Sequence, residues 1–145
     1  MNPESFFTSS QKQIIETSIS KAERMTSGEI RLHIDRVCHK DVMERSLQVF
    51  NNLGMYKTDL GTGVLFYLSI EDKKFAVIGD KGINAKVEND FWDNIFSTIV
   101  NYFKRSEFTE GLCWAIEEAG VQLSTYFPIK DDDINELPNT ISFEK

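Results

Sequence analysis

Residues 61–94, GTGVLFYLSIEDKKFAVIGDKGINAKVENDFWDN, decide the fold because they hold two hydrophobic strand-like runs separated by a short charged turn. The first run, 63–70, is almost continuously apolar, as is typical of a central strand covered on both faces. The turn at 71–74 is too short for a helical crossover, so the second run, 75–78, is expected to return as an antiparallel neighbour. The segment therefore predicts a β-hairpin inside a sheet.

A helix and a strand are predicted upstream of this hairpin. Thr8 and Gln11 have the spacing of a capping box, and apolar residues then repeat at helical spacing. Residues 29–37 alternate with period two, which predicts a strand with one wetter face. His33 falls on that wetter face, where we expect a solvated or hydrogen-bonded side chain rather than a metal ligand.

The remaining elements complete an α/β architecture. Asp41 is expected to cap a helix through about Asn52, so the strands on either side of that helix should be parallel. Two further helices are predicted over about 90–104 and 109–126 from their apolar stripes. Helices thus precede, connect and follow the strands of a small mixed β-sheet. This order predicts a three-layer α/β/α sandwich in which helices flank the sheet.

The chain of 145 residues is predicted to form one domain over residues 1–128, followed by an acidic, flexible C-terminal tail at 129–145. The net charge of -7 and the lack of a basic patch argue against nucleic acid as a partner. No apolar run is long enough to span a bilayer and no leader is evident, so a cytoplasmic protein is expected. Its two cysteines are expected to be reduced thiols, and the protein a monomer.

Aspartates stand at the turns around the hairpin. If its two strands are antiparallel, Asp80 at the end of the second lies beside Asp59 ahead of the first. The chain must then return to a helix that begins at Asp90, which can bring Asp90 or Asp93 over the same edge. Glycines in these loops let backbone carbonyls turn toward a ligand, and carboxylates, carbonyls and waters are the oxygen ligands of calcium. The pattern predicts a divalent-cation site.

Several motifs in this region resemble the TPM domain family, the soluble domain known from a thylakoid-lumen phosphatase-like protein and from many bacterial relatives. They are the loop and strand TDLGTGVLFYL, the strand end FAVIGDKGI, the helix start NDFW and the late segment FTEGL. The resemblance runs from about Phe6 to Pro128 and is strongest over 58–92. The run HKDVMERSLQVFNNLGMYKTDLGTGVLFYL is further similar to a cytosolic bacterial subgroup in which the domain stands alone.

The resemblance implies an α/β/α sandwich with a divalent-cation site at the acidic loop edge, calcium in some members, and an acid-phosphatase activity claimed for plant members. Asp80 and Asp90 match the acidic loop and helix-start positions of the family. Asp59 departs from the family pattern, which more often has Asn there. Asp93 and Glu88 are added to the candidate ligands because they lie nearby.

These observations favour a divalent-cation-binding domain that acts as a binding or accessory module, with calcium as the cation and magnesium as the alternative. Two other functions stay open: a metal-assisted acid phosphatase on phosphate monoesters, and a protein-interaction domain without chemistry. No nucleophile elbow, phosphate loop or zinc-type histidine pair is present, so no catalytic residue is assigned. Structural roles also fit, with Asp90 as a helix cap and Asp80 as a turn residue.

Overall fold

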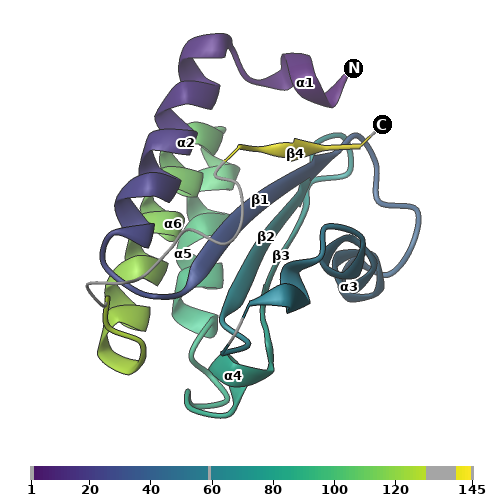
Figure 1. Ribbon diagram of the computed structural model, residues 1–145. Coiled ribbons are helices and arrows are strands. Elements are labelled where there is room, and N and C mark those ends of the chain that lie inside the picture. Colours follow the sequence, from purple (N-terminus) through teal and green to yellow (C-terminus); the bar gives the residue numbers. More distant parts are fainter. Residues whose placement is uncertain (1, 59, 130–139, 145) are drawn as a thin grey trace.

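A four-stranded mixed sheet in the order β3-β2-β1-β4 forms the centre of the computed structural model, which describes residues 2–58, 60–129 and 140–144 (Figure 1). Strand β2 runs parallel to β1 and antiparallel to β3, and β4 runs parallel to β1. The predicted hairpin and the predicted parallel pair are therefore confirmed. The strands are β1 (Glu29–Asp35), β2 (Gly63–Ser69), β3 (Lys74–Gly79) and β4 (Ser142–Phe143).

Helices cover both faces of this sheet. In Figure 1, α2, α5 and α6 lie against one face and α3 lies against the other, which confirms the predicted α/β/α sandwich. None of the described helices is long and apolar enough to cross a membrane. The helices are α1 (Pro3–Phe6), α2 (Ser9–Glu23), α3 (Val42–Asn52), α4 (Lys81–Asn84), α5 (Asp93–Lys104) and α6 (Phe108–Tyr126), with a 3₁₀ turn η1 (Met55–Lys57).

Helix starts follow local side-chain chemistry. Thr8 and Gln11 form the predicted capping box at the start of α2, with hydrogen bonds of 2.9 and 3.0 Å. Asp41 accepts from two backbone N–H groups at the start of α3, as predicted. The expectation that α5 begins at Asp90 is wrong, because residues 89–92 form a turn and the helix begins at Asp93 without a side-chain cap.

The core has two parts, one on each side of the sheet. Every residue of β2 is buried, as its continuous apolar run predicted. Phe66 and its neighbours on one face of the sheet pack against α2, α5 and α6, whereas Leu65 and Tyr67 pack toward α3. The two free cysteines, Cys38 and Cys113, are not joined to each other.

The prediction that one face of β1 is solvated is wrong. Glu29, His33 and Asp35 all lie on that face, yet they are 4%, 5% and 1% exposed. The face is covered because β4 lies beside β1 and α3 lies above it, and the polar groups of His33 and Asp35 are hydrogen-bonded instead of solvated. Alternation of polar and apolar residues with period two therefore cannot show whether the polar side chains face water or buried polar partners.

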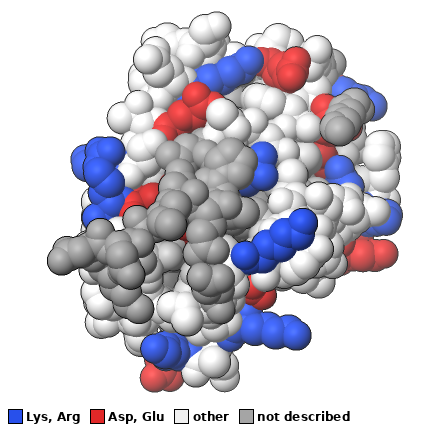
Figure 2. Space-filling view, in the orientation of Figure 1, with Lys and Arg blue, Asp and Glu red and all other residues white. Residues whose placement is uncertain are grey.

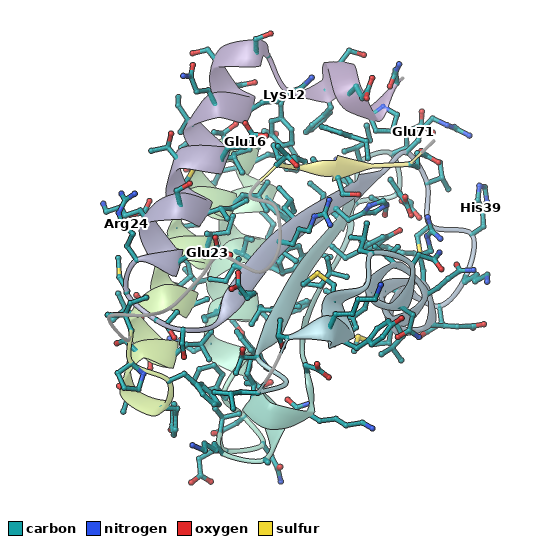
Figure 3. The ribbon with its side chains drawn as sticks, viewed as in Figure 1. Lys12, Glu16, Glu23, Arg24, His39 and Glu71 are labelled. Carbon is teal, nitrogen blue, oxygen red and sulfur yellow. The ribbon has the colours of Figure 1, made fainter. Side chains whose placement is uncertain are left out.

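Strand β4 and helix α4 were not predicted from the sequence. Part of the segment treated as a tail, residues 140–144, returns to the sheet, where His33 pairs with Ser142 and the N–H of Glu144 donates to Ile34 over 3.1 Å. Helix α2 supports this return with two side chains that point toward β4 in Figure 3. Glu16 accepts from the N–H of Ile141, and the Lys12 ammonium lies 5.3 Å from the centre of the Phe143 ring. Residues 130–139 and 145 lie outside the described residues.

Candidate functional site

One end of the sheet brings the start of β2 beside the end of β3, as the sequence predicted. Val64 pairs with Gly79, and the N–H of Asp80 donates to the carbonyl of Gly63 over 2.9 Å. The loop before β2 and helix α4 therefore lie side by side. We call this region, residues 60–63 and 79–84, the loop edge.

Two glycines allow the loop and α4 to cross closely. Gly61 has a φ of +66°, a left-handed conformation that favours glycine. A Cβ atom on Gly82 would lie 1.9 Å from the carbonyl oxygen of Leu60 and 2.6 Å from that of Gly61. Only glycine fits at position 82, and two backbone oxygens are consequently held against α4.

Asp80 stands next to this crossing. Its Oδ1 accepts a hydrogen bond of 2.7 Å from the N–H of Lys81 and so caps α4. Its Oδ2 lies 3.8 Å from the position that a Cβ on Gly61 would occupy. Between described residues, Oδ2 accepts no hydrogen bond. One carboxylate oxygen therefore remains for a ligand near the two loop carbonyls.

The other predicted ligands lie in the segment that follows α4. Glu88, Asp90 and Asp93 are exposed, and the carbonyls of Glu88 and Asp90 accept the hydrogen bonds that turn the chain into α5. Over residues 2–58, 60–129 and 140–144, no three His, Cys, Asp or Glu side chains gather in a group that could hold a metal ion. Asp59 lies outside the described residues. The ligand roles of all five residues stay predictions.

The opposite end of β1 carries a buried polar cluster that sequence reasoning did not assemble. The Asp35 carboxylate accepts from His33 Nε2 at 2.7 Å and from the Tyr67 hydroxyl at 2.6 Å. Arg45, from α3, donates to both oxygens of the same carboxylate through Nε at 2.7 Å and Nη2 at 3.1 Å. The second ring nitrogen of His33, Nδ1, lies 2.9 Å from the Ser142 hydroxyl.

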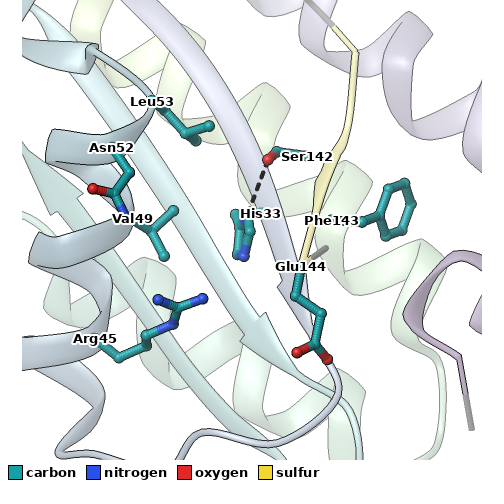
Figure 4. A pocket seen from close by; sticks show the side chains of 8 residues that line it. All are labelled: His33, Arg45, Val49, Asn52, Leu53, Ser142, Phe143 and Glu144. Atoms are coloured by element: carbon teal, nitrogen blue, oxygen red, sulfur yellow. Dashed lines mark hydrogen bonds between the residues drawn. The ribbon is translucent and has the colours of Figure 1, made fainter.

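A pocket of about 560 Å³ opens beside this cluster, between α3 and β4. Figure 4 shows Arg45 and Asn52 on the α3 side, Ser142 and Glu144 on the β4 side, and His33 between them. Ser142 is partly exposed and lines the pocket. The Phe143 side chain points away from the pocket in the same view.

Comparison with known proteins decides the family. The sequence profile of the TPM domain matches residues 1–122, most of the chain. The chain belongs to the TPM domain family. This confirms the resemblance found in the motifs around the hairpin. A comparison with curated proteins found no match.

Solved structures agree with this assignment. The BA42 protein from the psychrophilic bacterium Bizionia argentinensis, whose structure was solved by NMR, is 48% identical to this TPM domain, with a TM-score of 0.92 over 97% of each chain. The N-terminal domain of protein cg2496 from Corynebacterium glutamicum is 13% identical, with a TM-score of 0.66 over 86% of this chain and 79% of that one. An N-terminal domain from P. gingivalis is also 13% identical, with a TM-score of 0.69 over 85% and 80%. The last two share the fold.

Hydrogen bonds and burial shift the pKa values of the cluster around Asp35 in this TPM domain. Burial alone would raise the pKa of Asp35, but hydrogen bonds from His33, Arg45 and Tyr67 outweigh burial and hold that pKa well below its usual range. Burial and the hydrogen bond to Asp35 raise the pKa of Tyr67, and the Asp35 carboxylate raises the pKa of Arg45. The cluster therefore contains an ionised carboxylate, a neutral phenol and a guanidinium cation at neutral pH.

Surface charge of the TPM domain is mixed. In Figure 2, basic and acidic side chains are interspersed over the described part of the face shown. Salt screens exposed charges beyond a Debye length of about 8 Å at physiological ionic strength, so a ligand on this face would interact mainly with the charges nearest to it.

The sequence contained one signal for the missed cluster. His33 and Asp35 are two residues apart on a strand, so their side chains lie on the same face. Their partners Arg45, Tyr67 and Ser142 come from three other elements, and no spacing rule connects them. The serine in particular lies 109 residues from the histidine.

Proposed function

We propose that this TPM domain binds a divalent cation, calcium in preference to magnesium, at the loop edge, and acts as a binding or accessory module. The supporting observation is the position of Asp80, whose Oδ2 accepts no hydrogen bond from a described residue and stands beside the crossing of Gly61 and Gly82. The carbonyl oxygens of Leu60 and Gly61 are packed against α4 at the same crossing. These are hard oxygen donors, the ligand type that both cations prefer.

Calcium suits this donor set better than magnesium. Calcium accepts six to eight oxygens in flexible geometry and readily uses backbone carbonyls and waters, whereas magnesium demands a nearly ideal octahedron and retains its waters. Asp80 and the carbonyls of Leu60 and Gly61 are the residues that would hold the ion, together with Asp59 and water. A bound cation would supply positive charge that fixes the loop and could attract an anionic partner.

The expected affinity is modest. Only one carboxylate among the described residues of the loop edge is available, and calcium affinity falls with the number of charged ligands. We expect a Kd of roughly 0.1–1 mM, in the range of calcium sites of extracellular modules. Free calcium at ten times Kd should then stabilise the native state by about 1.4 kcal/mol.

Calorimetric and thermal-shift titrations with calcium and magnesium test the proposal, with Asp80→Asn as the decisive variant. Asn retains a side-chain oxygen for the cap of α4 but removes the charge, so calcium binding should weaken at least about tenfold while the fold is kept. Asp41→Asn is the matched control, because Asp41 is also an N-cap aspartate, at the start of α3.

The two variants separate the possible outcomes. If calcium binding weakens equally in Asp41→Asn and Asp80→Asn, its affinity depends on the net charge of the protein and not on a site at Asp80. Absence of heat and of any rise in Tm for the wild-type protein at 10 mM calcium would contradict the proposal.

A further inference from the structure

We propose that Ser142, His33 and Asp35 form a nucleophile, base and orienting carboxylate for acyl transfer, and that the pocket between α3 and β4 takes an ester of a carboxylic acid. This activity would use the end of the sheet away from the loop edge and requires no cation. It is separate from the proposed cation binding.

The three side chains form a continuous hydrogen-bonded chain. Ser142 Oγ lies 2.9 Å from His33 Nδ1, and His33 Nε2 lies 2.7 Å from Asp35 Oδ1. Both contacts are within the reach required between a nucleophile and its base and between a base and its orienting group. The ring nitrogens have exchanged partners relative to serine proteases, where Nε2 faces the serine. The role of each ring nitrogen is set by its hydrogen-bond partner. The exchange therefore preserves the hydrogen-bonded path from the serine through the histidine to the aspartate.

Asp35 determines the direction of the hydrogen bonds. Its carboxylate is 1% exposed and accepts from Tyr67 and Arg45 in addition to His33, so it is held rigidly and ionised. An ionised carboxylate only accepts hydrogen bonds, and His33 Nε2 must therefore carry the proton. In the neutral imidazole, Nδ1 then has a lone pair that can accept from the Ser142 hydroxyl, as a general base for that serine requires.

The reaction balances in two steps. Ser142 Oγ attacks the carbonyl carbon of the ester while its proton passes to His33 Nδ1, and the leaving alkoxide then takes that proton and departs as an alcohol. Water next gives a proton to Nδ1 and attacks the acyl carbon, after which Oγ leaves and recovers the proton. In each step Asp35 stabilises the transient imidazolium through Nε2–H.

The same pocket contains groups that can face the developing oxyanion. Arg45 and Asn52 line the wall on the α3 side, opposite Ser142 (Figure 4). Arg45 Nη1 donates to Gln48 on the protein surface over 2.8 Å, a contact that a bound substrate can replace. Guanidinium and amide N–H groups are among the donors that stabilise such an oxyanion.

Charge favours a carboxylic ester over a phosphate monoester. The positive charge of Arg45 is already paired with Asp35, and Glu144 adds a carboxylate to the opposite wall. The charged side chains that line the pocket are therefore one cation and one carboxylate, so the pocket has no excess of positive charge to hold a dianionic phosphate monoester. A neutral acyl ester needs no such charge.

Covalent labelling with a fluorophosphonate probe tests the proposal directly. An activated Ser142 Oγ should displace fluoride and form a Ser–O–P bond, which mass spectrometry locates in the tryptic peptide 131–145, where Ser142 is the single serine. Ser97, exposed on α5 and the single serine of peptide 87–104, is the reference for unactivated hydroxyls. We expect Ser142 to label at least about 100-fold faster than Ser97, the scale of general-base assistance.

Two variants extend the test, with EDTA present so that the outcome is independent of any cation. His33→Gln should slow labelling of Ser142 at least about 100-fold, and Ser142→Ala should remove the excess hydrolysis of 4-nitrophenyl acetate over that of free imidazole. Each variant is first checked for cooperative unfolding. The wild-type comparison of Ser142 with Ser97 needs no variant. Labelling of the two serines at equal rates would overturn the proposal, as would equal labelling of Ser142 in folded His33→Gln protein.

Discussion

Asp35 is held by hydrogen bonds on both oxygens of its carboxylate. Four N–H and O–H donors from His33, Arg45 and Tyr67 meet its carboxylate, which is almost fully buried. A charge at such depth is stable only if every neighbour supplies a hydrogen bond. Removal of one donor should therefore cost more than an ordinary surface hydrogen bond.

Tyr67→Phe tests this constraint at the scale of one hydroxyl. The change keeps the ring but removes the 2.6 Å hydrogen bond to Asp35, so we expect the free energy of unfolding to fall by about 1–3 kcal/mol. Urea denaturation measures it, and Tyr56→Phe, on an exposed tyrosine, should change it by less than about 0.5 kcal/mol. Equal stability of the Tyr67 variant and the wild-type protein would show that the hydroxyl is dispensable.

Single residues were predictable where their role is local. The capping roles of Thr8 and Asp41 follow from the residues that come next in the chain, and the structure confirms both. The role of Asp35 was not predictable, because its partners come from β1, β2 and α3. Alternating polar residues in a sequence predict a solvated strand face. The same pattern occurs when the polar side chains face buried hydrogen-bond donors instead of water.

At the scale of elements, the crossing of the β2 loop over α4 organises the candidate cation site. Both segments approach because Gly82 presents no side chain to the carbonyl of Leu60. The sequence indicated these glycines and the shared edge of the sheet. It did not indicate α4, which is a single turn with too few residues to carry a periodic pattern.

Gly82→Ala is the corresponding prediction. Although alanine favours helices, its Cβ would lie 1.9 Å from the Leu60 oxygen, so the loop must move and the free energy of unfolding should fall by about 1–3 kcal/mol. Calcium binding should weaken as well, since the loop carbonyls are displaced. Gly28→Ala is the control, because its Cβ would meet no atom closer than 3.5 Å. Similar effects of both substitutions would refute the importance of the crossing.

Strand β4 shows why other elements could not be predicted. It has two residues, below the length at which alternation is visible, and its position depends on contacts from α2 and β1 far away in the chain. The hairpin of β2 and β3, by contrast, was predicted because a long apolar run and a short turn allow one topology.

At the scale of the whole molecule, α2 joins the sheet through half-buried carboxyl groups as well as apolar packing. Glu23 accepts from the N–H of Ile30 over 2.9 Å, and Figure 3 shows it pointing from α2 toward β1. Burial raises the pKa of Glu23 to about 8, opposed by the hydrogen bond from the Ile30 N–H and assisted by the neighbouring Glu29. This carboxyl group links global stability to pH.

The sign of that linkage gives a prediction. A raised pKa means that the folded state retains a proton between about pH 4.5 and 8 that the unfolded state loses, so the contribution of this group to stability is complete below pH 4.5 and is lost as pH rises through about 8. Glu23→Gln, which stays neutral, should match the wild-type protein near pH 5 and exceed its free energy of unfolding at pH 8.5 by about 1–2 kcal/mol, a figure reduced for partial exposure. Urea denaturation across this range measures the difference, with Glu16→Gln on the same helix as control. A constant difference at every pH would contradict it.

The most direct test of the cation site is a calcium titration of ¹⁵N-labelled protein followed by NMR. Binding at the loop edge should shift the amide signals of Leu60, Gly61, Asp80 and Gly82 along saturable curves with one common Kd, and Asp80→Asn should raise that Kd at least about tenfold. Signals of β4 at the other end of the sheet should stay unchanged. If the loop-edge amides do not move at 10 mM calcium while other amides do, the cation site is elsewhere and the proposed function is wrong.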